Sequence, residues 1–551
     1  MNELTQDVRY ALRQIQKSLG FAFTAVLTLA LAIGITTVVF SVLYATLVRP
    51  LPYNQPDRIV YLQPISPQGY TQPASYPEYL DWRRENKTFS ALAGYSTGSS
   101  NFEGPAGPQP IHTVGATDNF FDVFKVAPIL GRTFAIGEGE PGKNNVAVLS
   151  YEVWQQTFAK SDTVIGQTIK LDGQTYTVIG VMPAGFRYPV NQRAAIYTPL
   201  QIPKEQREQR GNHWLPTIAR LKDGVSAQAA QADMDRVLAD QGRAFPDSQG
   251  RRMQIQDLAT QVLGDAGAPL KVLIFAVLSL LAIGCVNIAG LLLARGVKRE
   301  REFALRAAVG AGRGRVVRQI LTETVVLALL GAAAGIALAY GMLQVIRTLL
   351  ISALSRGADV HLSTPVLLAA IAVAVITSLL AGLTPALRLS RIAPMLALKS
   401  GGSAGSGRGQ HRLRAAFIIT QVGLAMVLLV TSGLLMRVLA GLRSTDLGFS
   451  PDHLITEEID LSPAAYRGRD FVTGFYQPML EKVRAIPGVA DVGLIQMLPI
   501  QSHGWNSDIT IVGQPPPPKN AEMLAEDRYV TPGYFKALGI DLVRGRMLDP
   551  K

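Results

Sequence analysis

Hydrophobic residues gather into five long runs, separated by stretches with the polar content of soluble protein. Each run exceeds the roughly 18 residues that a membrane-spanning helix needs. The first run, 21–48, carries no charge, and Arg49-Pro50 follows it instead of a small-residue cleavage site. It is therefore interpreted as a retained helix and not as a signal peptide. The other four membrane helices are predicted at 269–295, 315–349, 364–387 and 415–440.

Basic residues concentrate in two of the short segments between these runs. Residues 295–318 carry eight Lys or Arg, and 388–414 carry six with no acidic residue. The bias of Lys and Arg toward cytoplasmic loops places both segments, and the N-terminus, in the cytoplasm. We therefore expect a multi-pass protein of the inner (plasma) membrane, with 388–414 as a cytoplasmic linker and 49–268 and 441–551 outside the cytoplasm.

The segment 1–20 is predicted to form a short helix along the inner membrane surface. Apolar residues recur there at helical spacing and basic residues take other faces: Val8, Leu12, Ile15 and Leu19, and Arg9, Arg13 and Lys17.

The segment 49–268 is too long for a linker and contains both strand and helix patterns. Gln167–Val181 alternates apolar and polar residues around Asp172-Gly173, which predicts a β-hairpin. Helical periodicity covers Ser226 to Gln241. The fold class expected is an α-helical polytopic membrane protein with α+β extracytoplasmic domains.

An internal repeat joins the two outer segments. The segment Thr117–Phe121 corresponds to Thr531–Phe535, 414 positions later, and Gly131-Arg132 corresponds to Gly545-Arg546 at the same offset. The segment 441–551 is therefore interpreted as a second, incomplete outer domain. By symmetry we expect about a hundred further residues and three closing helices.

The composition of the chain mainly excludes particular partners and kinds of site. The net charge of +12 is explained by the basic loops, and no basic patch interleaved with aromatic residues indicates a nucleic-acid partner. Cys285 is the only cysteine, so an intramolecular disulfide and a cysteine-based metal site are excluded.

Two motifs imitate catalytic sites. Gly137–Asn144 nearly spells a phosphate loop, but Asn replaces the final Ser/Thr and a strand pattern follows where a helix is needed. Gly94-Tyr-Ser96-Thr-Gly98 matches a nucleophile elbow, but polar residues follow it and a loop is expected there. The six histidines lack metal-ligand spacing. We expect no catalytic, cofactor or metal site, and no enzyme.

The predicted spans also contain almost no buried charges, which an ion or proton pathway would need, and this disfavours a proton-coupled carrier. Gly331 and Gly335 fit close helix packing, although glycine is common in membrane helices in any case.

The chain resembles the MacB/FtsX-type ABC transporter permeases, and among them the acidobacterial-type duplicated orphan permeases. The resemblance rests on an ordered set of motifs: Asp7–Arg13, Leu29–Gly34, Arg49–Tyr53, Ser75–Trp82, Glu302–Arg306 with Gly310-Ala311-x-Arg313, Gln319-x-Leu321-x-Glu323, and Gly382–Ala386. It implies two four-helix permease halves in one chain, each with an outer MacB-like domain.

In that family the segment 296–314 is a cytoplasmic coupling helix that receives motion from an ATPase. Glu302 and Arg306 stand four residues apart, the favourable order for a helical ion pair, and Gly310-Ala311 permits a tight exit. Glu302, Arg306, Gly310, Ala311 and Arg313 are thus the candidate ATPase-coupling residues. For Arg313 a purely topogenic role fits equally well.

The resemblance implies a permease subunit that transmits ATP-driven motion from a separate cytoplasmic ABC ATPase to the outer domains, for efflux or export. Its expected partners are the lipid bilayer, that ATPase and a periplasmic adaptor or envelope protein. The alternative is an FtsX-like membrane regulator or scaffold of an envelope enzyme, without transport.

Overall fold

The computed structural model describes residues 2–104, 107–140, 142–143, 145–190, 195–264, 267–299, 302, 305, 312–353, 360–389, 408–459, 461, 470–500, 505–515 and 523–548. The chain divides into two compact units. One comprises Met1–Pro50 with Leu263–Ser444, and the other comprises Leu51–Val262 with Thr445–Lys551.

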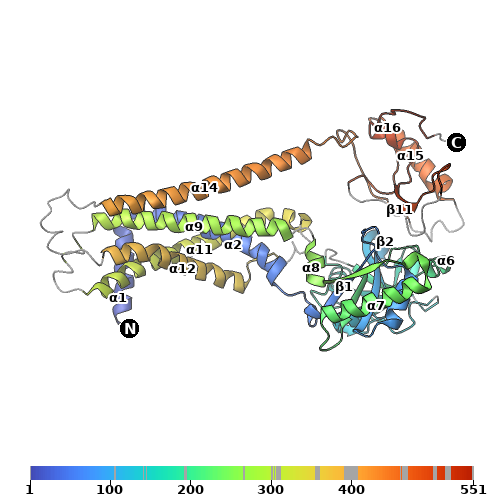
Figure 1. Ribbon diagram of the computed structural model, residues 1–551, viewed down its shortest axis with the longest axis horizontal. Coiled ribbons are helices and arrows are strands. Elements are labelled where there is room, and N and C mark those ends of the chain that lie inside the picture. Colours follow the sequence, from blue (N-terminus) through green and yellow to red (C-terminus); the bar gives the residue numbers. More distant parts are fainter. Residues whose placement is uncertain are drawn as a thin grey trace. The chain divides into compact units, whose positions relative to one another are not determined.

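The first unit is a bundle of long helices (Figure 1). Its helices are α1 (Asn2–Lys17), α2 (Leu19–Leu43, extended by a π-helical turn Tyr44–Val48), α9 (Gly267–Lys298), α11 (Arg313–Ala353), α12 (Thr364–Leu389) and α14 (Arg408–Arg443). Among the described residues, five helices are long and apolar enough to cross a membrane: Leu19–Val48, Pro269–Arg295, Arg313–Arg347, Thr364–Leu383 and Ala415–Arg443. The expectation of a polytopic helical membrane protein is therefore confirmed.

Small residues let the bundle helices approach closely. The core joins α2, α9, α11 and α12 through Ala25, Leu29, Ile288, Ala332 and Ala374. A Cβ atom added at Gly335 of α11 would lie 2.9 Å from the carbonyl oxygen of Ala30, and one at Gly331 would lie 2.5 Å from the Cβ of Leu29. These glycines therefore serve close packing of α11 on α2, the first of the two alternatives left open by the sequence.

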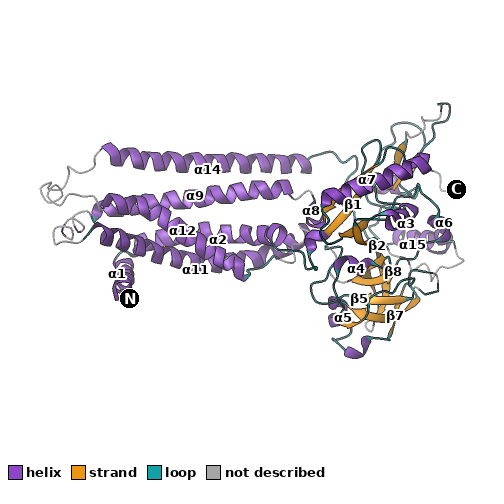
Figure 2. Ribbon diagram, turned by 60° about the horizontal axis from the view of Figure 1, so that its bottom comes forward, coloured by secondary structure: helices purple, strands orange, loops and turns teal. Residues whose placement is uncertain are grey.

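Helix α1 crosses the direction of the long helices at one end of the bundle (Figure 2). Ser18 alone separates it from α2. Its buried residues are Asp7 and Ala11, whereas Leu12 is 45% exposed and Leu19 belongs to α2. Val8 and Ile15, the other members of the predicted apolar stripe, are half-buried. The position of this helix along the inner membrane surface stays a prediction.

The first part of the second unit, Leu51–Val262, is built on one mixed sheet. Its strands are β1 (Ile59–Ile65), β2 (Phe89–Gly104), β3 (Gly107–Ala116), β4 (Leu130–Gly131), β5 (Val146–Leu149), β6 (Thr168–Leu171), β7 (Gln174–Val181), β8 (Ala195–Pro199), β9 (Thr217–Leu221) and β10 (Arg252–Asp257). The order is β10-β1-β9-β2-β3-β8-β5-β7-β4, and β6 pairs with β2 and β7. The pairs β3/β8 and β5/β7 are parallel.

Helices α3 (Tyr76–Glu85), α4 (Phe120–Phe124), α5 (Tyr151–Thr157), α6 (Lys204–Arg207), α7 (Ala227–Ala244) and α8 (Leu258–Leu263) complete this part. The predicted hairpin joins β6 to β7, with Asp172 and Gly173 both at positive φ, as a type I′ turn requires. The predicted helix is α7, where the Ser226 side chain accepts a hydrogen bond from the N–H of Ala229.

The C-terminal part contains α15 (Gln477–Arg484), paired strands β11 (Trp505–Asp508) and β12 (Leu524–Asp527), and α16 (Tyr534–Ala537). Its repeat segment has the local geometry of the first. The hydroxyl of Thr117 accepts a hydrogen bond from the N–H of Gly94, and the hydroxyl of Thr531 accepts one from the N–H of Leu494. Gly131 and Gly545 are both at positive φ.

Candidate functional site

The structure describes only part of the predicted coupling segment. Glu302 has helical backbone beyond the end of α9, and Arg313 is the exposed first residue of α11. Arg306, Gly310 and Ala311 lie outside the described residues. The expected ion pair between Glu302 and Arg306 therefore stays a prediction.

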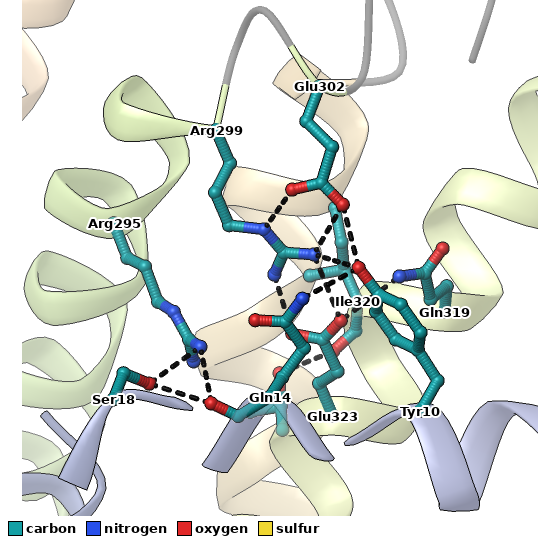
Figure 3. Close-up of polar contacts among 10 residues, drawn as sticks. Tyr10, Gln14, Ser18, Arg295, Arg299, Glu302, Gln319, Ile320 and Glu323 are labelled. Atoms are coloured by element: carbon teal, nitrogen blue, oxygen red, sulfur yellow. Dashed lines mark hydrogen bonds and ion pairs between the residues drawn. The ribbon is translucent and has the colours of Figure 1, made fainter. Parts of the chain in front are cut away.

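Glu302 joins helix α1 to the residue that follows α9. The Tyr10 hydroxyl on α1 donates a 2.7 Å hydrogen bond to Glu302 Oε1, and Arg299 Nε donates one of 2.9 Å to Glu302 Oε2 (Figure 3). The carboxylate thus links α1 to the residue that follows the last turn of α9.

Arg299 extends this link to α11. Its Nη1 lies 2.8 Å from Glu323 Oε2, and Gln319 Nε2 donates a 3.1 Å hydrogen bond to Glu323 Oε1. Burial disfavours the charged guanidinium, but the hydrogen bonds to Glu302 and the charge of Glu323 outweigh that cost, so the pKa of Arg299 is raised above its ordinary value. Arg299 therefore stays charged at any physiological pH.

We call the set Tyr10, Gln14, Arg299, Glu302, Gln319 and Glu323 the α1–α9–α11 cluster. Gln14 joins it by donating a 2.8 Å hydrogen bond to the Tyr10 hydroxyl. The Arg299 and Glu323 side chains are 13% and 9% exposed. At such burial, removing one partner of an ion pair leaves an uncompensated charge and costs about 3–5 kcal/mol.

Two flanking contacts hold α1 against the same helices. Arg295 of α9 donates a 3.3 Å hydrogen bond to the Gln14 carbonyl oxygen of α1 and one of 2.9 Å to the hydroxyl of Ser18, the residue that follows α1. Arg318 of α11 lies 3.0 Å from Asp7 of α1. Helix α1 is therefore attached through polar contacts along its inner face.

The cluster can carry force between helices, because charge-assisted hydrogen bonds fix the relative positions of the groups that they join. Within the described part of the chain, no group of three His, Cys, Asp or Glu side chains is placed to hold a metal ion.

Sequence reasoning missed the partners of Glu302. Tyr10, Gln319 and Glu323 belong to motifs that carried the family resemblance, but no role was assigned to them. Glu323 is only 7% exposed inside the third span, so it is an exception to the expectation that the spans contain almost no charge. A carboxylate inside an apolar run was the signal that could have identified it.

The two segments that resemble catalytic motifs adopt turn and strand structure. Gly137 and Gly142 occupy positive-φ turn positions ahead of strand β5, and Pro141 and Asn144 lie outside the described residues. The segment Gly94–Gly98 lies within strand β2 and pairs with β3, so the expected loop is wrong. Hydrogen bonds to β3 pair the backbone groups of this segment and keep the segment extended.

The outer domain contains a second polar cluster at the start of α3. Glu78 accepts 2.8 Å and 2.9 Å hydrogen bonds from Arg251 Nη1 and the N–H of Ser75, and Ser75 caps the helix in return. His213 Nε2 lies 3.3 Å from the same carboxylate. Burial raises the pKa of Glu78, but the His213 hydrogen bond and the charge of Arg251 outweigh it, so this pKa is lowered.

Two family models match the chain in order. A MacB-like periplasmic core domain matches residues 22–237, and the FtsX-like permease C-terminal domain matches residues 274–394. The periplasmic region of MacB from Actinobacillus actinomycetemcomitans covers 36% of this chain and 88% of its own, at 14% identity and a TM-score of 0.29.

Curated relatives are similar over about half of this chain. A macrolide export ATP-binding/permease protein MacB of Bdellovibrio bacteriovorus is 26% identical over 49% of this chain and 41% of its own length. The pyoverdine export ATP-binding/permease protein PvdT of Pseudomonas syringae is 26% identical over 52% of this chain and 42% of its own. The chain thus spans less than half the length of these relatives. With an extracytoplasmic MacB-like domain followed by an FtsX-like permease domain, it belongs to the MacB/FtsX-type ABC transporter permeases.

Proposed function

We propose that this chain is a permease subunit that transmits ATP-driven motion from a separate cytoplasmic ABC ATPase to its extracytoplasmic domains, for export. The observation that carries the proposal is the bond pattern of Glu302. One carboxylate in the predicted coupling segment is tied to α1 directly and, through Arg299, to α9 and α11. A displacement of this segment therefore acts on three helices of the bundle together.

The orientation of the chain supports a cytoplasmic position for the cluster. Helix α2 joins α1 at one end and leads to the extracytoplasmic MacB-like domain at the other. Because Leu19–Val48 crosses the membrane once, α1 belongs on the opposite side from that domain. The basic residues of 295–318 agree with this side.

The packing of α2 supports transmission toward the outer domain. Its Gly34 meets Gly335 of α11 so closely that an added Cβ would lie 3.0 Å from the Gly335 carbonyl oxygen. Tightly packed helices move as one body, since interiors resist compression. The α11 helix is thus placed to pass motion from Glu323 to α2, whose far end leads into the outer domain.

We further propose a duplicated architecture, in which 441–551 begins a second outer domain and α14 a second set of spans. The matching geometry at Thr117 and Thr531 supports this proposal. We also propose that the chain itself performs no catalysis and that an adaptor or envelope protein contacts the outer domains.

Reconstitution with ATPase subunits tests the coupling role. MacB-type ATP-binding subunits from the same genome would be added one at a time to the chain in nanodiscs, with ATP hydrolysis and binding measured. We expect one subunit to bind, and Glu302→Lys to weaken its binding at least about tenfold, since charge reversal at one contact opposes about 1.4 kcal/mol or more. The matched control Glu205→Lys, on exposed helix α6, should bind normally.

Undiminished binding by Glu302→Lys would contradict the coupling role. Binding without any substrate-dependent change in ATP hydrolysis, together with activation of an envelope hydrolase, would favour the FtsX-like regulator instead.

A further inference from the structure

Helix α1 has a second face that the coupling role does not use. From Thr5 to Lys17 the residues toward the bundle are Asp7, Tyr10, Ala11 and Gln14, which are buried or half-buried and hydrogen-bonded where polar. An adjoining side of the helix carries Arg9, Arg13 and Lys17, all exposed. These three cations follow at intervals of four residues, so they form one row along the helix.

We propose that this row binds the anionic phospholipid headgroups of the leaflet on which α1 lies. The proposal goes beyond the coupling role, because it requires only that the bundle spans a membrane. We call Arg9, Arg13 and Lys17 the α1 cationic row.

Covalent geometry places α1 at the membrane surface. Ser18 alone separates α1 from Leu19, where the first candidate span begins. A helix with this many charges does not enter hydrocarbon, and α1 crosses the direction of the spans (Figures 1 and 2). It therefore lies within the headgroup region or directly against it.

Exposed apolar side chains on α1 and in the first turns of α2 point to lipid as the partner. Leu12 is 45% exposed, and Leu19 and Phe23, in the first turns of the span, are each 70% exposed. Such side chains are stable at the acyl boundary, while neighbouring cations extend toward phosphates.

The charge balance of the helix favours an anionic partner. Between Thr5 and Lys17 the only acidic residue is Asp7, which is buried and paired with Arg318. Within residues 5–17 the three cations of the α1 cationic row therefore outnumber the acidic residues by three to one. An anionic leaflet attracts basic segments of this kind, and the attraction weakens with ionic strength.

Tryptophan quenching by brominated lipids tests the proposal on the full chain. The four native tryptophans, Trp82, Trp154, Trp214 and Trp505, all lie outside the helical unit, so Leu12→Trp supplies its only reporter. The chain would be reconstituted in mixed bilayers in which either phosphatidylglycerol or phosphatidylcholine carries the bromine. We expect brominated phosphatidylglycerol to quench several-fold more strongly at equal mole fraction and low salt.

Neutral substitutions in the α1 cationic row distinguish binding that depends on its charges from contact with lipid of any kind. The triple variant Arg9→Gln, Arg13→Gln, Lys17→Gln should quench equally with both lipids. The control triple Lys125→Gln, Lys160→Gln, Lys204→Gln removes the same charge from the outer domain and should keep the preference. In the Leu12→Trp variant with the row intact, a higher ionic strength should abolish the preference for phosphatidylglycerol. This measurement tests the α1 cationic row without changing its residues.

Equal quenching by the two lipids at low salt would overturn the proposal, as would a preference that survives in the α1 triple variant. A triple variant that loses ATPase-subunit binding in lipid-free detergent and keeps its lipid preference would assign the row to the protein partner instead.

Discussion

The hydroxyl of Tyr10 donates a 2.7 Å hydrogen bond to Glu302, although 292 positions separate the two residues. The bond joins the N-terminal helix to the segment that follows the second span. Because Glu302 also binds Arg299, and Arg299 binds Glu323, this contact is the N-terminal end of a chain of polar bonds through α1, α9 and α11. Separate segments of the sequence are thus joined by one series of polar bonds.

Tyr10→Phe tests the first bond of this chain. It removes the hydroxyl and keeps the ring, so we expect a loss of about 1 kcal/mol of bundle stability, the usual value for one hydrogen bond. Stimulation of the ATPase subunit should fall, because Glu302 loses its hold on α1. Thermal unfolding and ATP hydrolysis in nanodiscs measure the two effects. Tyr70→Phe, in an exposed outer position, is the control and should change neither.

Arg299→Lys tests the bridging geometry of the guanidinium. One ammonium lacks the planar fork that reaches Glu302 and Glu323 from different nitrogens. We expect Arg299→Lys to lose most ATPase stimulation, although the charge is kept. The control Arg443→Lys, at the exposed end of α14, should retain it. Normal stimulation by Arg299→Lys would show that charge alone is required.

Gly335→Ala tests the α2/α11 packing. The new methyl group would meet the Ala30 carbonyl at 2.9 Å and the Gly34 nitrogen at 3.0 Å, so the helices must separate. We expect a destabilisation of about 1–3 kcal/mol, typical of overpacking. Gly341→Ala on the same helix has no atom within 4 Å of its Cβ and serves as the matched control. Unfolding in detergent compares them, and equal midpoints would contradict the close approach.

The outer domain should lose stability in acid through Glu78. Its pKa is lower in the folded domain than its ordinary value of 4.5. The ionised carboxylate therefore stabilises the fold fully above pH 4.5, and this contribution is lost as the pH falls through the folded-state pKa. Tryptophan fluorescence during unfolding between pH 7 and 3 follows the change.

Glu78→Gln should lower the stability at pH 7 by about 3–5 kcal/mol, since Arg251 loses its buried partner, and should flatten the pH dependence. Exposed Glu205→Gln should leave both unchanged. An unaltered acid profile in Glu78→Gln would assign the acid sensitivity to other groups.

Local patterns in the sequence predicted the elements that depend on local chemistry. Apolar length predicted five spans, and Asp172-Gly173 predicted the β6/β7 turn, because each signal lies within the element that it specifies. Helix α7 followed from periodicity and the Ser226 cap for the same reason.

Contacts between distant segments were not predictable in this way. Nothing near Tyr10 indicates Glu302 as its acceptor, and the parallel pairing of β3 with β8 joins strands separated by several other elements. The Gly94–Gly98 segment was expected to be a loop because polar residues follow it, but pairing with β3 overrides that preference.

We propose that the α1–α9–α11 cluster passes ATP-driven displacement into the membrane helices. Spin labels at Gln16→Cys and Gly314→Cys, both exposed, in a Cys285→Ala background would report the distance between α1 and α11 with the ATPase subunit bound. We predict that ATP shifts this distance in the otherwise unchanged chain and that Arg299→Gln abolishes the shift while the subunit stays bound. If Arg299→Gln showed a distance shift of full size, the α1–α9–α11 cluster would not be the route by which the displacement is transmitted.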